Sequence, residues 1–316
     1  MTVANRAIGA PINIWNDHSD SMSQRDCGWI QLFAESNQEA LDLHIQAFKL
    51  GEELSLPVMV CMDGFILTHA YERVDVPSQA EVDAFLPAYQ PRQVLDPAEP
   101  VSIGAMVGPE AFTEVRYLAH ARQLQALDRI PQIAEEFRQR FGRQSGGLIR
   151  TYRMDDAQTA VVALGSVLGT LKDTIDEMRE AGIKIGVLGI HSFRPFPLTA
   201  VREALQGVDR LVVLDRSFSV GMGGVVATDV RMAMTGSQVR RGYTVVAGLG
   251  GRAITKASLH RMLREAIADK LPPLSFLDLD ERIVKRQLER EAAQRKSGPI
   301  AENLLRDVGT VASKVQ

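Results

Sequence analysis

The feature that most constrains this chain is the regular alternation of apolar runs and helical patterns between Thr159 and Ala268. Each apolar run has the length of a buried strand, and a segment of helical length follows each one. Strands that alternate with helices in this way predict an α/β fold with a parallel, doubly wound sheet. The predicted strands are Thr159–Leu164, Lys184–Ile190, Arg210–Leu214 and Tyr243–Ala247, and the predicted helices are Val167–Glu180, Leu198–Leu205, Gly224–Met234 and Lys256–Ala268.

A smaller α/β region precedes this one. Pro57–Met62 is a continuous apolar run of the kind found in strands buried on both faces. Asn37–Leu54 has apolar residues at helical spacing, and Ser36 or Asn37 is its expected N-cap. Pro11–Trp15 and Trp29–Ala34 are predicted as short strands. Because sheets usually have about four to six strands, we expect another chain to complete this one.

The middle and the end of the chain are predicted to be helical. Prolines crowd residues 77–109, a predicted surface linker with one short helix at Gln79–Leu86. Glu110–Phe141 follows as a long helix, and we expect Pro131 to break it because proline blocks a continuing helix. A charged helix at Glu281–Lys296 is expected to dock on a partner. With a boundary near Gly147, the predicted units are a first domain with its linker and long helix (1–147), a second domain (148–272) and a charged helical tail (273–316).

The composition argues against several classes of partner and location. With 36 basic and 39 acidic residues, the net charge of -3 gives no electrostatic case for nucleic acid or an anionic membrane. Cys27 and Cys61 are too few for an iron–sulfur cluster, which needs about four thiolates, and free thiols suit a cytoplasmic protein. No signal peptide is predicted, and no apolar run approaches the ~18 residues of a membrane span.

The densest group of candidate functional residues lies between Asn5 and Trp29. Its apolar run ends in a polar cluster, and ligands of open α/β sheets bind at the carboxyl ends of strands. Asp17, His18 and Asp20 carry side chains that can ligate metals. Because no further ligand follows at a metal-site spacing, we predict no metal site. The alternative is an Asx-rich turn whose side chains only satisfy backbone groups.

Several segments together resemble one known family. They are APINIWNDHSDSMSQRDCGWIQ, NQEALD and LPVMVCMDGFILTHAYE, then ALGSVLGT, FRPFP, VVLDRS with GMGG, and GLGGRAIT. In this order they resemble the α subunits of pyruvate:ferredoxin oxidoreductases, members of the 2-oxoacid:ferredoxin oxidoreductase family. The resemblance runs from about Arg6 to Arg264. Family members carry a further segment ahead of the position of Arg6, and we expect a separate chain, an N-terminal complement, to supply it.

The resemblance implies a fold, a reaction and partners. The first domain would be part of a pyrimidine-side thiamine-diphosphate-binding domain, and the second would be transketolase-C-like. The reaction would be oxidative decarboxylation of a 2-oxoacid, most often pyruvate, with coenzyme A as acyl acceptor. Thiamine diphosphate with Mg²⁺ would be shared with or held by a partner β subunit. Electrons would pass through iron–sulfur clusters of another subunit to ferredoxin or flavodoxin.

The resemblance also assigns roles to residues. The arginine of the matching segment binds the substrate carboxylate, and Arg6 stands at that position. A guanidinium can bind a carboxylate through two parallel hydrogen bonds. Asp17 and His18 would line the cofactor cleft. The glutamate that activates thiamine diphosphate would come from the segment ahead of Arg6, and the chain has no GDG…N pattern for the diphosphate. An ordinary surface arginine is the alternative for Arg6.

The role of two glycine clusters stays open. Gly221–Gly224 and Gly248–Gly251 follow predicted strands, where backbone N–H groups can bind phosphate, including that of coenzyme A. Tight turns that allow close packing are the favoured interpretation.

The loop NDHSDS differs from the GPSTG-like loop of 2-oxoglutarate-type enzymes, which favours pyruvate. The alternatives are a 2-oxoglutarate-type subunit, a non-catalytic assembly subunit and a stand-alone nucleotide-binding protein.

Overall fold

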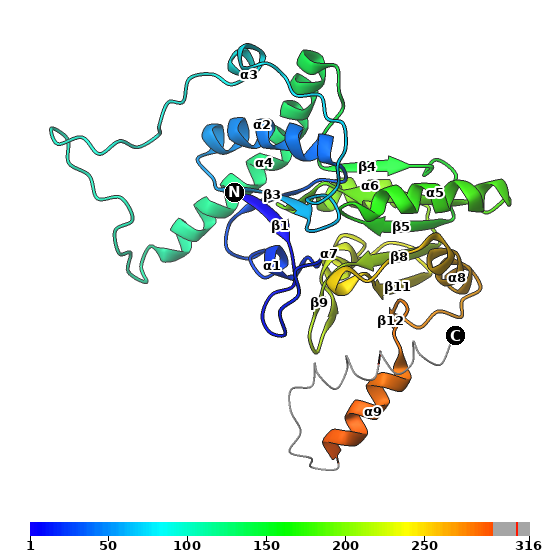
Figure 1. Ribbon diagram of the computed structural model, residues 1–316. Coiled ribbons are helices and arrows are strands. Elements are labelled where there is room, and N and C mark those ends of the chain that lie inside the picture. The colour runs from blue at the N-terminus through cyan, green and yellow to red at the C-terminus, as the bar shows by residue number, and fades with distance from the viewer. Residues whose placement is uncertain (293–307, 309–316) are drawn as a thin grey trace.

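The computed structural model describes residues 1–292 and 308. Two sheets lie next to each other, with helices packed over their faces (Figure 1). In the first half of the chain the elements are β1 (Thr2–Asn5), α1 (Ser19–Met22), β2 (Ile30–Phe33), α2 (Asn37–Leu54), β3 (Val58–Asp63), α3 (Gln79–Phe85) and α4 (Phe112–Phe141). In the second half they are β4 (Ile149–Tyr152), β5 (Thr159–Ala163), α5 (Val167–Glu180), β6 (Ile185–Ile190), β7 (Ser192–Arg194), α6 (Leu198–Ala204), β8 (Arg210–Asp215), β9 (Phe218–Ser219), β10 (Gly223–Gly224), α7 (Val225–Ala233), β11 (Arg241–Val246), the 3-10 turn η1 (Leu249–Gly251), α8 (Lys256–Ile267), β12 (Leu274–Phe276) and α9 (Glu281–Ala292).

The first sheet has the strand order β1-β3-β2-β7. β1, β3 and β2 are parallel, and the register sets Thr2 beside Val60. The prediction of a strand at Pro11–Trp15 is wrong, because these residues form an irregular loop in which Ile12 stays 82% exposed. The segment ahead of Arg6 pairs with β3 instead. A short apolar run becomes a strand only where the fold offers it a neighbouring strand.

The fourth strand of the first sheet comes from the second half of the chain. β7 runs antiparallel to β2, with Ser192 beside Leu32, and it directly follows β6 of the second sheet. At this crossing the Phe33 N–H donates to the His191 carbonyl across 2.8 Å. The chain itself therefore completes one edge of a sheet that was expected to need another chain. Within the described residues no strand pairs with the outer edge of β1. The boundary near Gly147 stays a prediction.

The second sheet confirms the predicted doubly wound architecture. Its order is β12-β11-β8-β5-β6-β4, and every pair is parallel except β4 with β6. The strand order reverses at β5, since β6 lies on one side of it and β8 on the other. All four predicted strands and all four predicted helices are present. β4, β7 and β12 escaped prediction because each has only three or four residues and no long apolar run.

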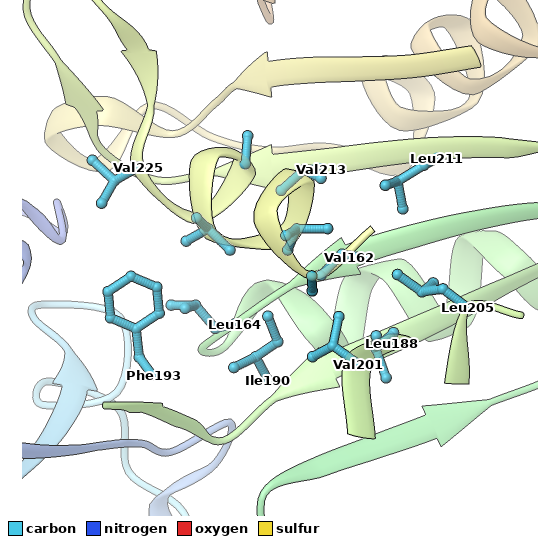
Figure 2. Close-up of a cluster of buried hydrophobic side chains, with 14 of the residues drawn as sticks. Val162, Leu164, Leu188, Ile190, Phe193, Val201, Leu205, Leu211, Val213 and Val225 are labelled. Atoms are coloured by element: carbon cyan, nitrogen blue, oxygen red, sulfur yellow. The ribbon is translucent and has the colours of Figure 1, made fainter. Parts of the chain in front are cut away.

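Apolar side chains fill both faces of the second sheet. α5 and α8 cover one face, while α6 and α7 cover the other. Figure 2 shows the apolar core under α6 and α7, in which Phe193 lies near Leu164 and Ile190. Phe193 also makes an edge-to-face contact with Phe33 of β2, with 6.2 Å between the ring centroids. Because this core includes residues of both sheets, it fixes them against each other.

α4 is one continuous helix of 30 residues, so the prediction that Pro131 breaks it is wrong. A proline removes one backbone hydrogen bond from the inside of a helix. Pro131 lies on the exposed face, however, and Ile130 and Phe137 on either side of it are buried against α2 and the first sheet. The packing of both turns outweighs the lost hydrogen bond.

Two segments extend away from the sheets. The predicted linker between α3 and α4 projects from the body of the molecule (Figure 1), and Leu95 and Met106 on it are exposed. α9 is the described part of the predicted helix Glu281–Lys296, and the last four residues of that prediction lie outside the described residues. In the described part of the chain, no helix has both the length and the apolar composition of a membrane span.

Candidate functional site

A buried carboxylate, that of Asp63, joins the two halves of the chain. Asp63 ends β3 and is fully buried. Its Oδ1 lies 2.6 Å from His18 Nε2, and its Oδ2 accepts a hydrogen bond from Arg216 Nη1, also across 2.6 Å. Arg216 directly follows β8. The carboxylate therefore connects the polar loop of the first half to the carboxyl edge of the second sheet.

Hydrogen-bond donors of the second sheet bind this carboxylate in the way that they would bind an anionic ligand. Ser166, which precedes α5, donates its backbone N–H to Asp63 Oδ2 across 2.8 Å and also donates its hydroxyl. Gly165 has a φ of +79°, and a Cβ on it would lie 2.8 Å from Asp63 Oδ1. Unpaired N–H groups and a partial positive charge stand at a helix N-terminus. Asp63 thus occupies a place where α/β proteins often bind phosphate or carboxylate ligands.

The electrostatics of this pair favour the ionised carboxylate. Burial by itself raises the pKa of Asp63, but the charge of Arg216 and the interaction with His18 more than offset this and hold the pKa well below its usual range. The Arg216 side chain is only 4% exposed. Removing one partner of a buried pair leaves an uncompensated charge, which costs about 3–5 kcal/mol.

His18 links the ion pair to the segment that carries Arg6. The His18 backbone N–H donates to the Arg216 carbonyl across 3.0 Å, and α1 begins at the next residue. Asp20 of α1 accepts hydrogen bonds from the Arg6 backbone N–H across 3.0 Å and from Asn5 Nδ2 across 2.7 Å. The Arg6 backbone is therefore held in place. Its side chain is exposed, and its guanidinium makes no hydrogen bond or ion pair with the part of the chain that the structure describes.

The structure gives the three sequence-predicted site residues different environments. Arg6 is exposed, while Asp17 is 7% and His18 is 1% exposed. Asp17 Oδ1 accepts a hydrogen bond from the Ser19 backbone N–H across 2.8 Å, which is the Asx-turn contact of the alternative interpretation. The roles of Arg6 at the substrate and of Asp17 and His18 at the cofactor cleft stay predictions.

A second polar cluster between the sheets contains residue types found in metal sites. Glu35, Glu39 and His191 bring three ligand atoms within 4.8 Å of one another. Both carboxylates already have cationic partners, because Arg150 Nη2 lies 3.2 Å from Glu39 and Lys172 Nζ lies 2.7 Å from Glu35. Burial raises the pKa of Glu39, but His191 and Arg150 lower it to about 2. A metal ion would have to displace these partners, so we interpret the cluster as an ion-pair network that joins the sheets.

The second glycine cluster contacts the polar loop. The Gly251 N–H donates to the Asn16 carbonyl across 2.9 Å, and Asn13 Nδ2 donates to the Gly250 carbonyl across 3.2 Å. A Cβ on Gly251, whose φ is +79°, would lie 2.4 Å from Trp15 Cβ. The close approach of the loop explains why glycine stands here. Coenzyme A binding by either glycine cluster stays a hypothesis.

Cavities occur at both edges of the second sheet. A cavity of about 290 Å³ is lined by Glu35, Ser166 and Arg216 among others, at the carboxyl ends of the strands. A larger one, of about 670 Å³, is lined by residues such as Gly207 and Gly236, which precede β8 and β11. Ligands of open α/β sheets bind at the carboxyl ends. The smaller cavity is therefore the one that belongs with the candidate site.

Comparison with known proteins identifies the family. Residues 1–137 match the model of the thiamine-diphosphate-binding domain of pyruvate flavodoxin/ferredoxin oxidoreductase, and residues 157–259 match pyruvate:ferredoxin oxidoreductase core domain II. Pyruvate synthase subunit PorA of Methanosarcina barkeri is 45% identical over 294 residues, which cover 90% of this chain and 73% of that protein. The chain belongs to the pyruvate flavodoxin/ferredoxin oxidoreductase family.

Other relatives place the chain among 2-oxoacid oxidoreductase subunits. Pyruvate synthase subunit PorA of Methanothermobacter thermautotrophicus is 41% identical, covering 84% of this chain and 68% of that protein. Ketoisovalerate oxidoreductase subunit VorA of Pyrococcus horikoshii is 38% identical, covering 81% of this chain and 65% of that protein. The 2-oxoglutarate:ferredoxin oxidoreductase of Magnetococcus marinus, solved with 2-oxoglutarate, coenzyme A and succinyl-CoA bound, shares the fold with a TM-score of 0.55. At 12% identity the match covers 84% of this chain and 48% of that one.

The described residues do not by themselves fit thiamine diphosphate with its Mg²⁺. The cation needs oxygen ligands beside the diphosphate. In the described part of the chain, the cluster with metal-ligand geometry is the one around Glu39 and His191, and Arg150 and Lys172 already neutralise its carboxylates.

Sequence reasoning missed most of the residues that build this site. The site residues predicted from the sequence are Arg6, Asp17 and His18, and they do not include Asp63, Arg216 or Ser166. These last three stand one or a few residues beyond a predicted buried strand. Polar residues at the carboxyl ends of parallel strands are the signal that could have found them.

Proposed function

We propose that the chain is the α-type subunit of a pyruvate:ferredoxin oxidoreductase. The complex would catalyse the oxidative decarboxylation of pyruvate, transfer the acyl group to coenzyme A and pass the electrons to ferredoxin or flavodoxin. Family membership supports this reaction class. Within the complex, this chain binds the 2-oxoacid and lines the cofactor cleft. Partner chains make most of the contacts to thiamine diphosphate.

Arg6 is the residue that carries the proposal. It combines a fixed backbone with an exposed guanidinium that has no partner among the described residues. A guanidinium of this kind is available for a substrate carboxylate, which it can bind through two charge-assisted hydrogen bonds. The reacting 2-oxo group lies next to that carboxylate, so the clamp also orients the carbonyl for attack.

Pyruvate is the proposed substrate. The loop Asn16–Ser21 has the sequence NDHSDS in place of the GPSTG-like loop of 2-oxoglutarate-type enzymes. Pyruvate synthase subunits are 45% and 41% identical to this chain, and a ketoisovalerate oxidoreductase subunit is 38% identical. The alternatives are therefore a subunit for another 2-oxoacid, including a 2-oxoglutarate-type subunit, or a non-catalytic assembly subunit.

The proposal requires several partners, and we place the complex in the cytoplasm. A β subunit would bind the diphosphate and Mg²⁺ of the cofactor, an iron–sulfur subunit would carry electrons, and an N-terminal complement would extend the first sheet. The outer edge of β1, which no strand of the described residues pairs with, supports the last of these. Two cysteines leave the iron–sulfur clusters to other chains.

The test is to isolate the native complex through a tag on this chain. Electron-acceptor reduction is then measured with pyruvate, 2-oxoisovalerate and 2-oxoglutarate, each with and without coenzyme A. We expect coenzyme-A-dependent reduction with the highest kcat/KM for pyruvate. A preference for another 2-oxoacid would change the substrate assignment. A cofactor-loaded complex with no 2-oxoacid-dependent reduction would overturn the proposal.

A further inference from the structure

The buried ion pair of Asp63 and Arg216 lies where the second sheet would otherwise bind a ligand. In doubly wound sheets, ligands bind at the carboxyl edge where the strand order reverses. Here the order reverses at β5, between its neighbours β6 and β8. Ser166 follows β5 and Arg216 follows β8, and both bind the Asp63 carboxylate that reaches them from the first sheet. The chain's own carboxylate therefore occupies hydrogen-bond donors at the point where the strand order reverses, beside the cavity of about 290 Å³.

The other oxygen of the same carboxylate holds the polar loop. Asp63 Oδ1 contacts the His18 ring, and the His18 backbone N–H bonds to the Arg216 carbonyl. His18 is therefore held through both its side chain and its backbone by one ion pair. A change in the seating of the second sheet on the first would move His18 directly.

Only a short series of contacts separates His18 from Arg6. The His18 carbonyl accepts a hydrogen bond from the Met22 N–H across 2.9 Å, which closes the turn of α1. Asp20, inside that turn, binds the Arg6 backbone N–H across 3.0 Å. These hydrogen bonds connect His18 to the backbone of Arg6 through the single turn of α1.

We propose that Asp63 and Arg216 are positioning residues that set the place of the Arg6 guanidinium, so that the fit between the two sheets controls the affinity for the 2-oxoacid carboxylate. The inference rests on the proposed function, in which Arg6 binds that carboxylate. In this proposal both residues act through Arg6 and not as ligands of the substrate. A substrate-binding group misplaced by about 1 Å can lower the rate about a hundredfold. A small shift of the loop that holds Arg6 is therefore enough to change kcat/KM.

The experiment is a double-mutant cycle in the assembled enzyme. Asp63→Asn preserves the size of the side chain but removes the charge that holds Arg216 and His18. We expect kcat/KM for pyruvate to fall about tenfold or more, mainly through a higher KM, with thiamine diphosphate content unchanged. Because Asp63 acts through Arg6, we expect Asp63→Asn to add less than about twofold when Arg6 is already alanine, whereas independent effects would multiply.

Two further variants make the result decisive. Asp42→Asn is the matched control, because Asp42 is a buried carboxylate of α2 whose ion pair with Arg143, across 2.7 Å, joins α2 to the segment after α4. It should leave KM within about twofold. If Asp63→Asn does not assemble, Ser166→Ala replaces it in the cycle, since it removes one hydroxyl, which donates to the same carboxylate and accepts from Arg216 Nη1. It should raise KM by a smaller factor, about threefold, that again disappears in the Arg6→Ala background.

The outcomes separate this inference from the proposed function. If Arg6→Ala raises KM but the variant at the ion pair leaves KM unchanged, or if the two effects multiply, the positioning role is refuted and the substrate role of Arg6 stands. If Arg6→Ala leaves kcat/KM unchanged, the proposed role of Arg6 fails, and the positioning role fails with it.

Discussion

Arg216 Nη1 lies 2.6 Å from Asp63 Oδ2, although 153 residues separate the two positions in the chain. This contact ties β3 of the first sheet to β8 of the second, and it lies beneath the loop that holds Arg6. With β7 in the first sheet and the shared core around Phe193, it makes the two sheets one structural unit. The predictions below test what this unit does and what holds it together.

Arg6→Ala should lower kcat/KM for pyruvate about ten- to a hundredfold in the assembled enzyme. The reason is that charge-assisted hydrogen bonds contribute about 1.5–3 kcal/mol, and each 1.4 kcal/mol is about tenfold. Arg6→Lys should restore only part of the loss, because an ammonium cannot reproduce the planar fork. Steady-state kinetics on cofactor-loaded complexes provide the measurement, and Arg73→Ala, at a side chain 93% exposed, is the control. A wild-type value of kcat/KM in Arg6→Ala would show that Arg6 does not bind the substrate carboxylate.

The isolated chain should not bind thiamine diphosphate measurably. Arg150 and Lys172 already neutralise the acidic cluster around Glu39, and no other cluster with metal-ligand geometry occurs in the part of the chain described here. Titration calorimetry with thiamine diphosphate and Mg²⁺ should give no binding heat for the chain alone and clear binding for the complex. Tight Mg²⁺-dependent binding to the isolated chain would contradict the prediction.

Phe193→Ala should destabilise the protein by about 3–5 kcal/mol, the usual range for a fully buried phenylalanine. Phe193 is 0% exposed and contacts residues of both sheets. Phe48→Ala is the matched control, because Phe48 on α2 is 63% exposed and its truncation opens no cavity. Denaturant unfolding of wild type and both variants gives the comparison. Equal losses for the two variants would show that the core of Figure 2 does not join the sheets as described.

Asp215 should make stability depend on pH near neutrality. Burial raises the pKa of its carboxyl from 3.8 to about 7, even though the Val226 and Ala227 N–H groups hydrogen-bond to it. Because the folded state holds this proton more tightly, the associated stabilisation is complete below pH 3.8 and is lost as the pH rises through 7.

Asp215→Asn removes this titration, so the variant should gain stability relative to wild type between about pH 5 and pH 8. The gain should reach at most about 3 kcal/mol, from ~1.4 kcal/mol for each pH unit up to the folded pKa. Melting temperatures at the two pH values measure it. Asp26→Asn, at an exposed side chain, should show no such change. A constant difference between Asp215→Asn and wild type would mean that Asp215 stays ionised throughout.

The sequence by itself determined the elements whose formation depends on local pattern. The alternation of apolar runs and helical segments after Thr159 predicted four of the six strands of the second sheet and all four helices that cover it. The spacing of apolar side chains along a buried strand or helix can be read from consecutive residues. Of the two expected N-caps of α2, Ser36 and Asn37, the structure has Ser36, whose side chain accepts a hydrogen bond from the Glu39 N–H. The family was also recognisable from short segments spread along the chain.

Only the tertiary structure decided which strands pair and which polar residues meet. Pro11–Trp15 has the composition of a strand, yet Thr2–Asn5 occupies the edge of β3, since pairing depends on what lies beside a segment in space. Pro131 stays inside α4 because the packing of Ile130 and Phe137 outweighs one lost hydrogen bond. The contacts of Asp63 with Arg216 have no local pattern at all. They arise because parallel strands from distant parts of the chain place their carboxyl ends together, and only the folded arrangement of the two sheets brings those ends to one point.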